Sequence, residues 1–177
     1  LLVLIFFIPM IAVFVFRYMY TTVQGMMMPF ASWVGVGYTP VPNLIGMPQQ
    51  IVLSTNLLFG AFLLVASFIA AVGISGGIYV IRNMVWTEGI FVANDFWRGI
   101  KINIVIWLQS TVFYAVMLYL FTISINWASY MNASGTGNDV LNSISIAVSY
   151  IAIAIVTLMY LWMLSMGGNY KLKFFQL

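Results

Sequence analysis

The side chains that could perform chemistry in this chain are few. The sequence has no histidine and no cysteine, which removes thiolate nucleophiles, disulfides and the commonest metal ligands. Its acidic residues are Glu88, Asp95 and Asp139. A catalytic site needs a nucleophile–base pair, a carboxylate pair or a set of metal ligands in register, and these three residues supply none of them. We therefore expect a protein that is not an enzyme, with no catalytic residue, no metal site and no cofactor.

The basic residues are also sparse, and most of them gather in two places. One connection holds Arg82, Arg98 and Lys101, and the C-terminal tail holds Lys171 and Lys173. The sixth basic residue, Arg17, stands apart from both groups. Six spread cations are too few for a nucleic-acid-binding face, so we expect no nucleic-acid partner. Cytoplasmic loops of membrane proteins carry an excess of Lys and Arg, which makes these cations markers of topology.

The composition indicates that lipid surrounds most of the chain. Of 177 residues, 64% are hydrophobic and only 5% are charged, and the mean hydropathy is +1.08. A soluble domain has roughly 25% charged residues on which to build its water-facing surface. Membrane lipid is therefore the first partner that the sequence predicts.

Four apolar stretches are long enough to cross a bilayer, which takes about 20 helical residues. They are residues 1–20, 51–72, 102–127 and 144–166. Polar and apolar residues do not alternate in them, as they would in the strands of a barrel. We expect an all-α, polytopic transmembrane helix bundle, a single integral membrane domain over residues 1–177. The distribution of cations predicts that the N- and C-termini are cytoplasmic.

The connections between the spans carry turn-forming residues. Residues 21–50 hold four prolines and four glycines, which predicts a non-helical outer loop. Three glycines interrupt the second apolar run, and we expect the helix to end or bend there, before a short helix from Ile78 to Thr87. Arg17 is expected at the outer end of the first span, with its side chain reaching the headgroups.

Small and polar residues within the spans suggest helix packing. Gly73 and Gly77 form a close-approach face, either for another helix of the same chain or for a partner or second copy. Asn56 and Gln109 are interpreted as interhelical hydrogen-bonding residues.

Residues 78–101, which we call the elbow, are the most informative connection. Asn94 or Asp95 is a plausible N-cap for a helix that begins at Phe96. In one interpretation the elbow lies in the membrane interface, with Phe91, Phe96 and Trp97 among the headgroups. In the other it docks a cytoplasmic or membrane partner, because ionic residues gather here. The predicted partner-binding residues are Arg82, Glu88, Asp95, Trp97, Arg98 and Lys101.

The elbow resembles the YesL family of bacterial membrane proteins, a domain of unknown function. The resemblance rests on spaced single residues: Tyr79, Arg82, Asn83, Glu88, Asp95, Phe96, Trp97, Gly99, Lys101 and Asn103. The tail from Asn169 to Leu177 is similar to the stretch before that family's last span. The proline that usually stands near the end of the second span is absent. The resemblance implies a fifth span after Leu177, and an accessory role near carbohydrate ABC importers.

These observations favour a non-catalytic accessory or assembly subunit in the bacterial cytoplasmic membrane, bound to other membrane proteins or to itself. The complete spans carry no ionisable residue of the kind that coupled transporters and ion channels use. The alternative is a pore-forming or carrier unit for a neutral solute, whose path hydroxyl and amide groups would line.

Overall fold

The computed structural model describes residues 2–33, 47–86 and 91–169, with side chains for residues 2–22, 49–86 and 91–166. These residues form four helices: α1 (Leu2–Trp33), α2 (Met47–Trp86), α3 (Val92–Ala133) and α4 (Asp139–Asn169). Each is long and apolar enough to cross a membrane, and each contains one of the predicted spans. The expected all-α, multi-pass membrane architecture is confirmed.

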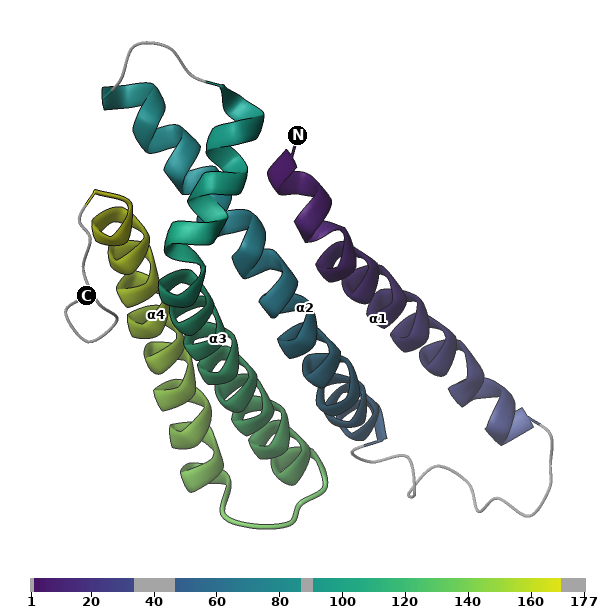
Figure 1. Cartoon of the computed structure of the whole chain (residues 1–177). Coiled ribbons are helices and arrows are strands. Elements are labelled where there is room, and N and C mark those ends of the chain that lie inside the picture. Colours follow the sequence, from purple (N-terminus) through teal and green to yellow (C-terminus); the bar gives the residue numbers. More distant parts are fainter. Residues whose placement is uncertain (1, 34–46, 87–90, 170–177) are drawn as a thin grey trace.

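The helices are arranged as an open row in the order of the chain (Figure 1). Neighbours in sequence run antiparallel, so α1 packs on α2, α2 on α3 and α3 on α4. Among the described residues, α1 and α4 make no close backbone approach. The row therefore leaves an open side between its first and last helices, with α2 and α3 beneath.

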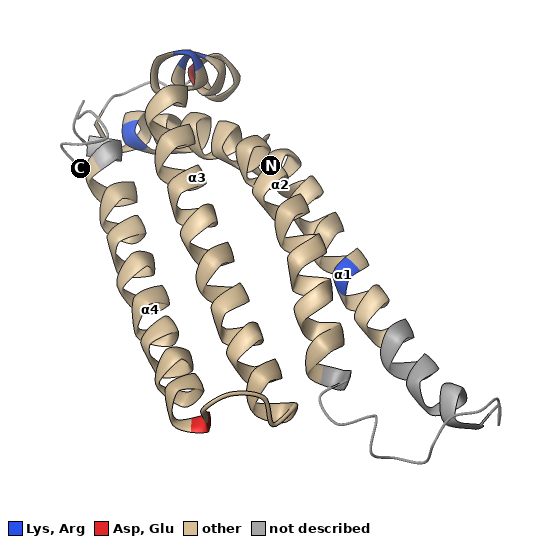
Figure 2. Cartoon of the chain, turned by 90° about the horizontal axis from the view of Figure 1, so that it is seen from below, with Lys and Arg blue, Asp and Glu red and all other residues tan. Residues whose placement is uncertain are grey.

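The glycines of α2 lie in helix contacts and do not end the helix. A methyl group placed at Gly73 would lie 2.7 Å from Cβ of Phe6, and one at Gly77 would lie 2.7 Å from Cγ2 of Val3. Gly76 lies in the same way under the ring of Phe96 in α3. Of the two outcomes predicted here, an end of the helix and the separate short helix after it are wrong, because α2 is continuous, whereas a bend agrees with the change of direction of α2 in Figure 2. The absent side chains let two neighbouring helices pack closely.

Residues 21–50 are not a loop throughout. The helix α1 continues to Trp33, and α2 already begins at Met47. Pro48 is compatible with this start because a proline in the first helical turn lacks only an N–H that has no partner within the helix. The remainder of the predicted loop, residues 34–46, lies outside the described residues.

The elbow is built from bent helices that are anchored in the protein. At 40 and 42 residues, α2 and α3 are about 60 Å long, which is twice the thickness of the hydrocarbon core. Figure 2 shows α2 changing direction in its second half, and it shows the start of α3 nearly end-on. Each helix thus turns away from its own membrane-spanning part.

Phe96 anchors the elbow and does not face the headgroups, contrary to our expectation. Only 1% of its surface is exposed, and it forms a core with Val80 and Ile100 that residues of α1 also contact. Its ring lies 5.9 Å from that of Phe6. In contrast, Phe91 and Trp97 are exposed. The buried ring therefore joins three helices at this end of the bundle.

The predicted N-cap of α3 is also wrong. The helix begins at Val92, and the backbone N–H of Asp95 already donates to the carbonyl oxygen of Phe91 at 2.9 Å. Asp95 lies within the first turn, where a negative charge interacts favourably with the helix dipole.

The connection between α3 and α4 is short. Gly135 and Gly137 have φ angles of 67° and 109°, which other residues adopt at a cost. The side-chain oxygen of Asn138 accepts the backbone N–H of Val140 at 3.0 Å and caps α4.

We expect Gly73→Leu to destabilise the α1–α2 contact, because Phe6 leaves no room for the new side chain. Overpacking of this kind costs about 1–3 kcal/mol, and thermal unfolding in detergent would measure it as a lower melting temperature. Ala61→Leu is the matched control, since Ala61 is exposed on the same helix. Equal melting temperatures for the two variants would contradict the assigned packing.

Candidate functional site

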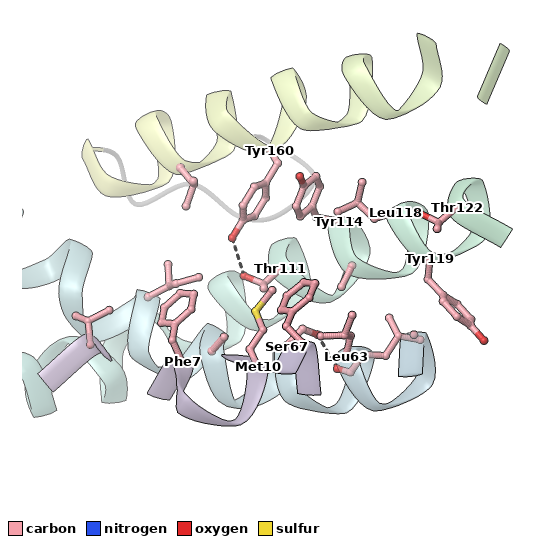
Figure 3. A pocket seen from close by; sticks show the side chains of 18 of the residues that line it. Phe7, Met10, Leu63, Ser67, Thr111, Tyr114, Leu118, Tyr119, Thr122 and Tyr160 are labelled. Carbon is pink, nitrogen blue, oxygen red and sulfur yellow. Dashed lines mark hydrogen bonds between the residues drawn. The ribbon is translucent and has the colours of Figure 1, made fainter. Parts of the chain in front are cut away.

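An apolar groove runs between α1 and α4, with α2 and α3 as its floor. Its volume is about 720 Å³, and side chains of all four helices line it (Figure 3). Most of them are apolar, such as Phe7, Met10, Leu63 and Leu118. The groove follows from the open row, because no helix among the described residues covers the floor between the two outer helices.

Arg17 is the charged residue of this groove. Its Nε–H donates to Oδ1 of Asn56 at 2.8 Å, and Asn56 is only 8% exposed. Both residues line the groove. The hydrogen bond joins α1 to α2 and fixes the guanidinium group beside the apolar surface.

The sequence predicted Arg17 at the outer end of the first span, and the helix α1 itself does not end near this residue. The helix α1 continues for 16 residues beyond Arg17, or about 24 Å. Its partner Asn56 lies nine residues into α2. In Figure 2 the basic position of α1 lies about midway between the elbow and the α3–α4 turn. A charge at this depth is costly unless it is paired, and such residues usually have a function.

Hydroxyl groups form a seam between α3 and α4 along one side of the groove. Thr111 and Tyr160 are hydrogen-bonded at 3.2 Å, and Tyr114 and Thr157 at 3.3 Å. The rings of Tyr114 and Tyr160 stack at a centroid distance of 4.3 Å (Figure 3). These paired hydroxyls satisfy one another in lipid and hold α4 on α3.

Tyr119 closes the groove near Arg17. Its ring lies over Gly60, and its hydroxyl donates to the carbonyl oxygen of Leu57 at 3.0 Å. A side chain of α3 therefore crosses to α2 close to the position at which Asn56 receives Arg17.

The predicted partner-binding residues lie at the elbow end of the bundle, as the charged residues of Figure 2 show. The guanidinium of Arg82 stands 5.6 Å from the centroid of the Tyr79 ring, a cation–π arrangement. Trp97, Arg98 and Lys101 are exposed. Glu88 lies outside the described residues. Among the described residues, the elbow therefore offers two exposed basic groups, while Asp95 is half-buried and no ion pair joins these residues.

The predicted helix-packing and polar residues divide between the interior and the surface. Gly73 and Gly77 face α1 of the same chain, so the described contacts use them internally. Asn56 makes an interhelical hydrogen bond, whereas Gln109 is exposed on α3.

The sequence analysis missed the groove and the hydroxyl seam. The seam has a signal in the sequence, because Thr111 and Tyr114 are three residues apart, as are Thr157 and Tyr160. Residues at that spacing lie on one face of a helix. The groove has no such signal, since it depends on which helices fail to meet.

Comparisons with family models, with curated proteins and with solved structures find no match to this chain. The resemblance to the YesL family therefore rests on the spaced residues of the elbow and on the tail alone.

A double-mutant cycle at Arg17 and Asn56 tests whether the pair stabilises the α1–α2 contact. We expect Arg17→Met and Asn56→Leu each to lower the free energy of unfolding by about 1–3 kcal/mol, because each leaves a polar partner unsatisfied. The double variant should lose less than the sum, because it leaves neither group unpaired. Thermal unfolding in detergent measures all four proteins, and strictly additive losses would contradict the pairing.

Proposed function

We propose that this chain is a non-catalytic integral membrane subunit that packs against other membrane proteins. The observation that carries the proposal is the open row of helices, whose apolar groove contains the charge of Arg17. A protein that worked alone in lipid would be more stable if its helices closed over such a charge. A partner that covers the groove supplies that closure.

The elbow supports the same proposal from the other end of the molecule. Phe96 and its core hold the bent segments firmly, while Trp97, Arg98 and Lys101 remain exposed. Aromatic and Arg side chains are enriched where proteins bind one another. The proposed subunit thus has two contact surfaces, the groove within the membrane and the elbow at its edge.

The proposed location is a bacterial cytoplasmic membrane, with the elbow on the cytoplasmic side. The cations of the elbow support this orientation under the positive-inside rule. The YesL-like residues connect the subunit with a carbohydrate ABC importer. Affinity purification from native membranes, with quantitative mass spectrometry, tests that connection directly.

Charge reversal at the elbow should weaken partner recovery. We expect Asp95→Lys, Arg98→Glu and Lys101→Glu together to lower the recovered partner about tenfold, because like charges would then face one another. The melting temperature should fall only slightly, since Arg98 and Lys101 are exposed and Asp95 contributes mainly a favourable interaction with the helix dipole. Asp139→Lys at the opposite end is the control, and equal recovery from both variants would contradict an elbow interface.

One observation favours a second function, the passage of a neutral solute. Hydroxyl groups of Ser67, Thr111 and Thr122 line the groove with its aromatic residues. Liposomes that contain the purified chain alone separate the two proposals. Flux of a neutral sugar through them would favour the carrier, and sealed liposomes would favour the accessory subunit.

A further inference from the structure

Arg17 carries a positive charge that no carboxylate of the described residues neutralises. Its only hydrogen-bonding side-chain partner among them, Asn56, is a neutral amide. The acidic residues of the sequence lie elsewhere. Asp95 is in the first turn of α3, Asp139 is in the first turn of α4, and Glu88 is thirty-two residues beyond Asn56 in the sequence. The described residues therefore present a cation to the groove without an anion.

The geometry of the guanidinium leaves its outer donors for that anion. Asn56 takes the Nε–H, and the two terminal amino groups make no hydrogen bond to the other described residues. Arginine binds a carboxylate through two parallel hydrogen bonds, which are stronger than neutral ones. The contact with Asn56 orients the group for such a partner.

The depth of Arg17 decides between a lipid and a protein as the source of the anion. The anionic group of a membrane lipid lies at the headgroup level, whereas the basic position of α1 lies away from both the elbow and the α3–α4 turn (Figure 2). A carboxylate reaches that depth on a transmembrane helix, whose backbone satisfies its own hydrogen bonds. The four predicted spans do not supply one to a second copy of this chain, because they contain no acidic residue.

We propose that the groove between α1 and α4 receives a transmembrane helix of another membrane protein, and that one Asp or Glu near the middle of this helix pairs with Arg17. The apolar floor, including Leu63 and Leu118, packs against the rest of the helix. This inference rests on the proposed accessory function and names the chemistry of its partner. The ion pair also explains why an arginine occupies a position where an apolar residue would have a lower desolvation cost.

Site-specific photo-crosslinking in native membranes tests the proposal. The photoreactive residue p-benzoylphenylalanine replaces Leu118 in the groove and, as a control, Val105, which is exposed on α3 outside the groove. Mass spectrometry identifies the crosslinked segment. We expect the adduct at Leu118 to be a transmembrane helix of another protein that carries Asp or Glu within its span.

Variants of Arg17 show whether charge selects that helix. Arg17→Met should lower the yield of the Leu118 adduct at least about tenfold, as loss of a desolvated charge pair does at protein interfaces, while Arg17→Lys keeps most of it. The adduct at Val105 should not change. If Arg17→Met fails to fold, Arg17→Met combined with Asn56→Leu takes its place, since it leaves no unpaired amide.

Charge exchange completes the test. Arg17→Glu should abolish the adduct, and replacing the partner's acidic residue by Arg should restore it. An adduct with a lipid, with another copy of this chain or with a helix that lacks an acidic residue would overturn the proposal. So would the absence of any adduct, or a yield that Arg17→Met leaves unchanged.

The two proposals can fail separately. If partners co-purify through the elbow while the groove captures only lipid, the accessory function stands and the intramembrane ion pair is wrong. If purification from native membranes recovers no partner and the groove yields no protein adduct, the accessory function itself is wrong.

Discussion

The short distance between α2 and both of its neighbours is the contact on which the remaining arrangement depends. Lipid is as apolar as the helix surfaces, so close packing must hold helices together in place of the hydrophobic effect. Gly73 and Gly77 admit α1 on one side, and Gly76 admits the ring of Phe96 on another. Because these contacts occupy two faces of α2, the fourth helix packs mainly on α3, and the row remains open.

An open row changes what the polar side chains must do. The hydroxyls of Thr111 and Tyr160 satisfy each other between α3 and α4, and so add stability without needing a ligand. Arg17 differs from them because Asn56 can accept a hydrogen bond but cannot cancel a charge. The low dielectric constant of the membrane makes that difference large. The groove therefore indicates a charged partner, whereas the seam does not.

The connections were harder to predict from the sequence than the spans. Glycine and proline suggested breaks at Gly73 and Pro48, yet both residues lie inside α2. In each case the neighbours decided the outcome: a packed helix covers Gly73, and the first turn tolerates Pro48. Phe96 was expected among headgroups for a similar reason, since its sequence context does not reveal the space that Gly76 leaves for its ring.

The sequence by itself determined that four of its stretches are apolar and long enough to cross a membrane as helices, as the described residues confirm, and that most of its basic residues gather in one connection and the tail. These properties depend on composition and on the length of apolar runs, which no tertiary contact alters. Only the tertiary structure decided that Arg17 pairs with Asn56 beside an open groove. The physical reason is that apolar residues cover all faces of each helix, so the sequence does not show which faces meet. The residues that lie opposite a side chain also depend on the offset between its helix and the neighbouring helix.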